Sequence, residues 1–124
     1  MRSVPHLALT PTDKAITITA DDRDTEVGGN MSHDYDVTLA TPGGGKVVTR
    51  IHFQRGPIAE AGVNGLTNEV LIAIVIDRLN GAQEGPFRSR FNALAITALE
   101  QASLWLCKRT LDRMERGVEG QSKV

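Results

Sequence analysis

The sequence has few cysteines, few aromatic residues and no excess of charge of either sign. Its 124 residues include one cysteine, Cys107, which excludes an intramolecular disulfide and fits a reducing compartment. Aromatic residues make up 4%, so any core must be mainly aliphatic. The numbers of basic and acidic residues are nearly equal, with fourteen Lys and Arg and fifteen Asp and Glu. This balance creates no global field that would attract a DNA or RNA polymer or a membrane surface.

Long apolar runs are also missing, and we find no signal peptide. The run Val70–Ile76 has seven residues, whereas a membrane-spanning helix needs about 20. We therefore expect a cytosolic protein. The length fits a single domain, 1–124, with a β-sheet part at 1–55 and a helical hairpin part at 56–120.

The N-terminal half alternates apolar and polar residues in a way that is typical of strands. The three alternating stretches are KAITITAD (14–21), HDYDVTLA (33–40) and KVVTRIHFQ (46–54). Between the last two, TPGGG is a strong turn signal, which predicts an antiparallel hairpin. The glycines Gly43–Gly45 would suit a phosphate loop only at a helix N-terminus with a lysine and a hydroxyl nearby. A turn between strands is therefore the better interpretation.

The C-terminal half predicts two helices. Thr67 is a suitable N-cap for a helix to about Asn80, whose run Val70–Ile76 is apolar on every face. A longer helix is expected from about Pro86 to Gly117. Its apolar residues repeat at steps of three and four: Phe91, Leu94, Ala98, Ala102 and Trp105. We predict an α+β fold, with a small N-terminal antiparallel sheet and a C-terminal hairpin of two helices. A lone hairpin cannot cover these surfaces, so we also predict at least a dimer.

Residues suited to catalysis or to metal binding are sparse. His6, His33 and His52 lie on separate segments without a second ligand at a metal-type spacing, so we expect no metal site. No serine has a plausible His and Asp around it for nucleophilic catalysis. Asp34 and Asp36 share one strand face and are the only credible carboxylate pair for acid–base chemistry. A solvated face of an edge strand is the simpler interpretation. We expect no cofactor and no enzymatic activity.

Basic residues gather at the end of the second helix. Arg109, Arg113 and Arg116 are spaced by four and three, which places them on one helix face where their guanidinium groups can clamp phosphates. Spacing alone favours a simpler interpretation, in which they complement the helix dipole. Another polar group suited to anions begins the same helix: Arg88, Arg90 and Asn92.

Several stretches together resemble a known family. They are GPIAEAGVNGLTNEVLIAIVIDRL, the GxQxGPF connector, FNALA and WLCKRTLDRMERGVEG. They are similar to the hairpin domain of phage anti-defence "sponge" proteins, the Thoeris anti-defence type-one and anti-CBASS type-two family. Members sequester the cyclic nucleotide messengers of bacterial immunity without cleaving them, and they assemble as dimers and hexamers.

The N-terminal sheet makes the chain resemble the Thoeris type, whose ligand is a cyclic ADP-ribose isomer. Several members of the family also hold cyclic di- and trinucleotides. The resemblance implies a binding protein that acts in the cytoplasm of the infected bacterial host. Two other functions remain open: an enzyme that hydrolyses the nucleotide with Asp34 and Asp36, and a structural hairpin that only mediates interactions.

The resemblance carries ligand-binding roles onto Asn92, Arg109 and Arg113, with the arginines gripping pyrophosphate or ribose oxygens in a dimer cleft. It extends to further candidates: Arg116, the connector residue Gln83, and Arg55, Gly56, Asn64 and Thr67 of a loop suited to a cyclic oligonucleotide. The connector departs from the family at Ala82, where an aromatic residue is usual. A methyl group offers no face for an adenine, a contact worth roughly 1–3 kcal/mol per base.

Overall fold

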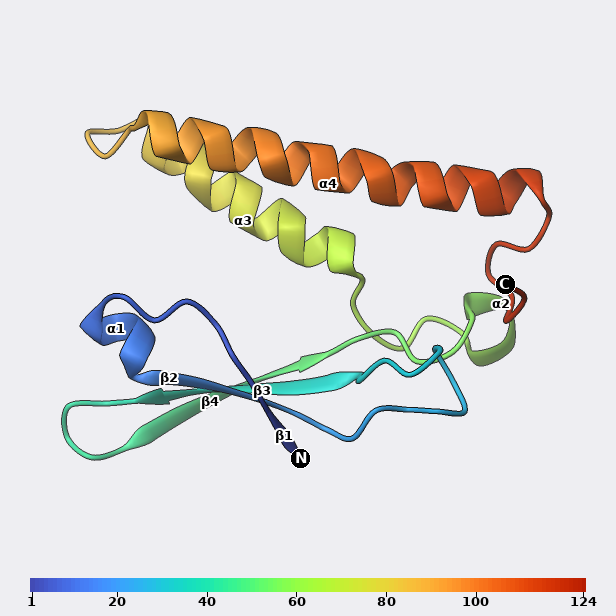
Figure 1. Ribbon diagram of the computed structural model, residues 1–124, viewed down its shortest axis with the longest axis horizontal. Helices are drawn as coiled ribbons and strands as arrows, with labels where there is room; N and C mark the ends of the chain where they lie inside the picture. Colours follow the sequence, from blue (N-terminus) through green and yellow to red (C-terminus); the bar gives the residue numbers. More distant parts are fainter. The chain divides into compact units, whose positions relative to one another are not determined.

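The structure, a computed structural model, describes residues 1–124 and divides into two compact units, Met1–Leu66 and Thr67–Val124 (Figure 1). The first unit contains a four-stranded antiparallel sheet and the second a helical hairpin, so the predicted α+β class is confirmed. No helix combines the length and the apolar character that are needed to cross a membrane. The single domain with a boundary between its parts at residue 55 stays a prediction.

The sheet contains β1 (Arg2–Val4), β2 (Ile16–Ala20), β3 (Asp34–Ala40) and β4 (Lys46–His52), paired in that order. The register places Ile18 opposite Val37 and Val37 opposite Thr49, while Asp36 lies opposite Arg50 on the other face. The period of two therefore separates an apolar face from a polar one, as the sequence predicts. Strand β1 is additional, because three residues are too few to show a period.

The predicted hairpin turn between β3 and β4 is confirmed. The Thr41 N–H donates to the Gly45 carbonyl at 2.9 Å, and Gly44 has a φ of 81°, which favours glycine. Two single-turn helices, α1 (Pro11–Lys14) and α2 (Ile58–Ala61), were not expected from the sequence. Each has only four residues, fewer than helical periodicity needs in order to be visible.

The hairpin consists of α3 (Asn68–Gln83) and α4 (Arg90–Glu115), with α4 the longer (Figure 1). The Thr67 hydroxyl accepts from the Val70 N–H at 3.3 Å and caps α3, as predicted. The predicted start of α4 near Pro86 is wrong. Ser89 is the N-cap, with its hydroxyl 3.0 Å from the Asn92 N–H, because a serine side chain satisfies an amide that Pro86 cannot serve from the connecting turn. At the other end Gly117, at φ 70°, follows the helix as expected.

The two helices bury little apolar surface. Side chains at steps of three and four on α4 are half-buried, including Ile96, Leu99 and Leu106. The apolar stripe that the sequence shows lies beside this row and is mostly exposed, with Phe91 80% and Trp105 70% exposed. We call it the outer stripe: Phe91, Leu94, Ala98, Ala102 and Trp105. Across the whole chain, Ala20 is the only buried hydrophobic residue. The fold therefore leaves unusually much apolar surface in contact with water.

Candidate functional site: the basic end of the long helix

A hollow of about 460 Å³ lies on the surface of α4 around Arg109. Its lining comes from two turns of the helix: Trp105, Lys108, Arg109, Leu111, Asp112 and Glu115. The Arg109 side chain is exposed, and no hydrogen bond or ion pair engages its guanidinium group. Trp105 precedes it by one helical turn, so an aromatic face and a free cation lie side by side. The sequence pattern places Trp105 in the apolar stripe and gives no sign of a site that it shares with Arg109.

Arg113, one turn further along, is in a different state. Its Nε–H donates to Glu119 Oε2 at 3.1 Å, and its Nη1 donates to the Lys123 carbonyl at 2.9 Å. Its Nη2 donates to the carbonyls of Val118 and Gln121 at 3.0 and 2.9 Å. The side chain is only 14% exposed. The segment that follows α4 therefore encloses this guanidinium group.

The third arginine also has partners within the helical unit. Arg116 donates from Nε to Asp112 Oδ2 at 3.1 Å, one turn away, and from Nη1 to the Val124 backbone oxygen at 2.8 Å. About half of its side chain is exposed. Of the three arginines predicted to bind anions, Arg109 alone presents an unpaired guanidinium group to solvent.

The candidates at the other end of the hairpin hold the connector between α3 and α4. The Gln83 side-chain amide accepts from the Ser89 N–H at 2.8 Å and donates to the Ser89 carbonyl at 3.0 Å. The Asn92 side chain donates to the Phe87 carbonyl at 3.2 Å. Ala82 is half-buried in the last turn of α3 and presents only its methyl group.

Asn92 and Arg109 lie far apart within one chain. They are 17 positions apart on one continuous helix, which corresponds to roughly 25 Å at about 1.5 Å per residue. A nucleotide-sized ligand cannot contact both residues of the same copy. These two candidates can share a ligand only if they come from different copies.

The loop between β4 and α3 is held together by its own polar groups. The Asn64 amide accepts from the Arg55 N–H and donates to the Arg55 carbonyl, both at 2.8 Å. A Cβ at Gly65 would lie 2.4 Å from the Phe53 carbonyl carbon, so this glycine permits a close approach of the chain to itself. Gly56, at φ 83°, begins the turn. Asn64 has a structural role here, and the Thr67 hydroxyl is engaged in capping α3.

Asp24 connects this loop to the segment between β2 and β3, a role that no pattern in the sequence indicates. One carboxylate oxygen accepts from the N–H groups of Val27 at 2.9 Å and Glu26 at 3.0 Å. The other lies 2.7 Å from Arg55 Nε and 3.3 Å from Nε2 of the buried His33. The Val27 and Glu26 amides and the Arg55 guanidinium hold the pKa of Asp24 at about 2, below its usual 3.8.

This pKa predicts how the stability of the first unit depends on pH. A carboxylate whose pKa is lowered by folding stabilises the fold above about pH 4, and this contribution disappears as the pH falls towards 2. Asp24→Asn is therefore expected to lower Tm at pH 7, and the difference from the parent should shrink between pH 4 and pH 2. Thermal unfolding followed by circular dichroism measures it, with the exposed Asp22→Asn as control. A difference that is the same at pH 7 and pH 2 would contradict the assignment.

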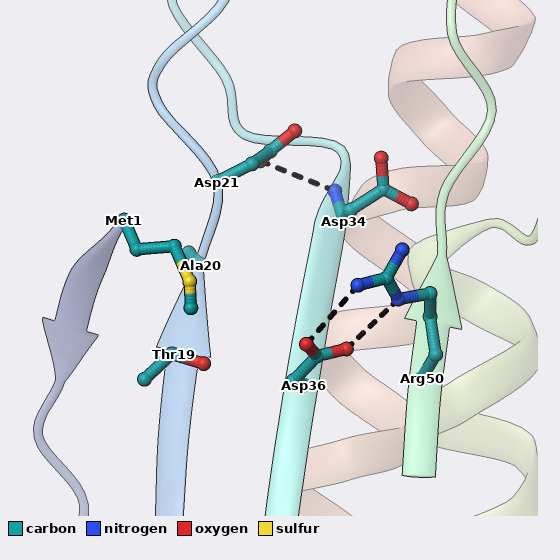
Figure 2. A pocket seen from close by; sticks show the side chains of 7 residues that line it. All are labelled: Met1, Thr19, Ala20, Asp21, Asp34, Asp36 and Arg50. Carbon is teal, nitrogen blue, oxygen red and sulfur yellow. Dashed lines mark hydrogen bonds and ion pairs between the residues drawn. The ribbon is translucent and has the colours of Figure 1, made fainter. Parts of the chain in front are cut away.

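A second, small hollow of about 50 Å³ lies on the polar face of the sheet (Figure 2). Its carboxylates come from Asp21, Asp34 and Asp36. Arg50 donates to both oxygens of Asp36, at 2.9 and 3.1 Å, and this pairing lowers the pKa of Asp36. Asp34 Oδ1 lies 2.6 Å from His52 Nδ1. Asp34 and Asp36 thus each have their own basic partner, and these two carboxylates do not share a proton.

Comparison with known proteins relates both the sheet edge and the hairpin to other sequences. The family model described as the Acb2/Tad1 hairpin domain matches residues 45–111, which include α3, the connector and most of α4. A protein of Bacillus phage SBSphiJ7 named "Thoeris anti-defense 1" is 55% identical over 76 residues. The match covers 61% of this chain and 53% of that protein, so the chain spans about half the length of this relative.

Proposed function

Because the chain belongs to the Acb2/Tad1 hairpin-domain family, we propose that it is a phage anti-defence protein that binds cyclic nucleotide messengers of bacterial immunity. It sequesters them in the host cytoplasm and does not cleave them. A cyclic ADP-ribose isomer is the first candidate ligand, and cyclic di- and trinucleotides are the second. The name of the phage relative supports the anti-defence role.

The free Arg109 at the end of the outer stripe is the observation that carries this proposal. Arg109 follows Ala102 by seven residues and Trp105 by four, so it continues the line of the stripe. A second copy that covers the exposed stripe therefore also covers Arg109 and excludes water from it. A guanidinium group in such a cleft binds a pyrophosphate through charge-assisted, bidentate hydrogen bonds.

Asn92 and Arg109 come close to each other if two α4 helices pair in antiparallel orientation across the outer stripe. The first residues of one helix then lie near the last residues of its partner, which brings Asn92 of one copy towards Arg109 of the other. Each dimer contains two such sites by symmetry. Hexamers form by association of dimers through apolar surface that remains exposed, such as that of Ile74 and Val75 on α3.

Trp105 provides the aromatic surface that the connector lacks at Ala82. It lines the hollow beside Arg109, and its exposed indole gives an adenine a face on which to stack. The hollow is lined by α4 alone, so enclosing a ligand there requires the second copy. The adenine and the pyrophosphate of one ligand then contact adjacent turns of α4.

The function is tested by incubating the purified protein with a cyclic ADP-ribose isomer, removing free ligand, heating the protein and identifying what is released. Unchanged ligand is the expected result. Altered ligand would indicate a hydrolase, and no released ligand would favour a structural hairpin. Trp105 is the only tryptophan, so its fluorescence reports binding at the hollow without a label. Cyclic di- and trinucleotides are tested in parallel.

A further inference from the structure

We infer that the segment Val118–Val124 is an internal competitor for the ligand, with Glu119 as its anionic group and Arg113 as the contested residue. The inference rests on the proposed function, because it concerns the same basic end of α4. It assigns a role to a segment that lies beyond the family match, which ends at residue 111, and to which the sequence pattern gives no ligand-binding residue.

The contacts of Arg113 exclude a second anion. A guanidinium group has five N–H donors, and four acceptors of the segment already engage Nε, Nη1 and Nη2. The strong bidentate contact between arginine and phosphate uses two adjacent N–H groups along one edge of the guanidinium plane. The segment leaves only one Nη1 N–H of Arg113 free, so Arg113 cannot form a bidentate contact with a phosphate while the segment is bound.

The acceptors also resemble those of the proposed ligand. Glu119 contributes a negative oxygen, and the carbonyls of Val118, Gln121 and Lys123 contribute neutral ones, as the oxygens of a phosphorylated ribose do. Arg109 has no such partners. The two arginines are therefore unequal before ligand binds: one is available, and the other must first be released.

The backbone around Glu119 suits a segment that opens. Gly117 and Gly120 flank it with φ values of 70° and 76°, and glycine changes such angles at little steric cost. α4 ends at Glu115, before the segment begins, so opening requires no unwinding of the helix. If the segment is open in about a tenth of the molecules, the apparent Kd is about tenfold above the intrinsic value.

Calorimetry with inorganic pyrophosphate and with a cyclic ADP-ribose isomer tests the competition in three variants. A chain that ends at Gly117 is expected to bind both probes about tenfold more tightly than the parent, and Glu119→Gln about threefold more tightly. Glu100→Gln removes the same charge from an exposed position on α4 outside the hollow and should leave binding unchanged. Equal or weaker binding by both the truncated chain and Glu119→Gln would overturn the inference.

A measurement without nucleotide separates failure of the inference from failure of the proposed function. Phenylglyoxal modifies accessible guanidinium groups, and peptide mass spectrometry compares its rates at Arg113 and Arg109. Slow modification of Arg113 in the parent, with equal rates at the two arginines in the truncated chain, is expected. Equal rates in the parent would overturn the inference even if the ligand binds. If no variant binds a cyclic nucleotide, the proposed function fails, and pyrophosphate binding and labelling still decide the competition.

Discussion

Replacing Arg109 by alanine is expected to weaken the binding of a cyclic ADP-ribose isomer by about 30- to 1,000-fold. The guanidinium group has no partner in the ligand-free chain, so its hydrogen bonds form only with ligand, and their loss costs about 2–4 kcal/mol. Arg109→Lys is expected to recover only part of the affinity, because an ammonium group lacks the planar fork that matches two phosphate oxygens. Isothermal titration calorimetry measures both variants.

The matched control is Arg78→Ala. Arg78 is an exposed arginine of α3 outside the hollow, so its replacement changes the net charge equally without touching the site. Thermal unfolding of the ligand-free variants completes the comparison. An Arg109→Ala variant with parental affinity, or equal losses for the two alanine variants, would contradict the site. A lower Tm with unchanged affinity would instead indicate that Arg109 only complements the helix dipole.

The elements that show a clear hydrophobic periodicity, or a strong turn or capping signal, could be predicted from the sequence. The alternation in β3 and β4, the glycines between them and the Thr67 cap each depend on neighbouring residues, and the structure confirms them. The sequence does not locate the start of α4 correctly, because two local signals compete in the connector. Pro86 suits a first helical position, but the hydroxyl of Ser89 binds an amide of the first turn and sets the boundary.

Whether each arginine of the candidate site is free or paired could not be predicted, because it depends on contacts with residues outside the local sequence pattern. Arg109 and Arg113 have the same residue type and one turn between them, so their spacing predicts the same role for both. Only the path of the chain after Gly117 distinguishes them, because it brings Glu119 and three carbonyls to Arg113. Asp24 and Arg55 are 31 positions apart in the sequence. Their ion pair therefore cannot be predicted from the residues around either of them.

The exposed outer stripe leads to an equally large expected effect on assembly. Ala98 lies near its centre, is exposed, and is small enough to let two helices approach closely. Ala98→Glu is expected to convert the proposed oligomer to a monomer. A symmetric interface contains the substitution twice, and a buried, unpaired carboxylate costs about 3–5 kcal/mol. Light scattering at micromolar concentration measures the mass.

The same substitution should abolish ligand binding, because the proposed site combines Asn92 of one copy with Arg109 of another. Thr97→Glu is the matched control: it introduces the same side chain one residue earlier, at an exposed position off the stripe, and should keep both the mass and the affinity of the parent. Glutamate is a good helix former, so α4 should remain intact in both variants. A monomeric parent, or an Ala98→Glu variant with parental mass, would contradict the interface. A monomeric variant that keeps full affinity would show that one copy contains the whole binding site.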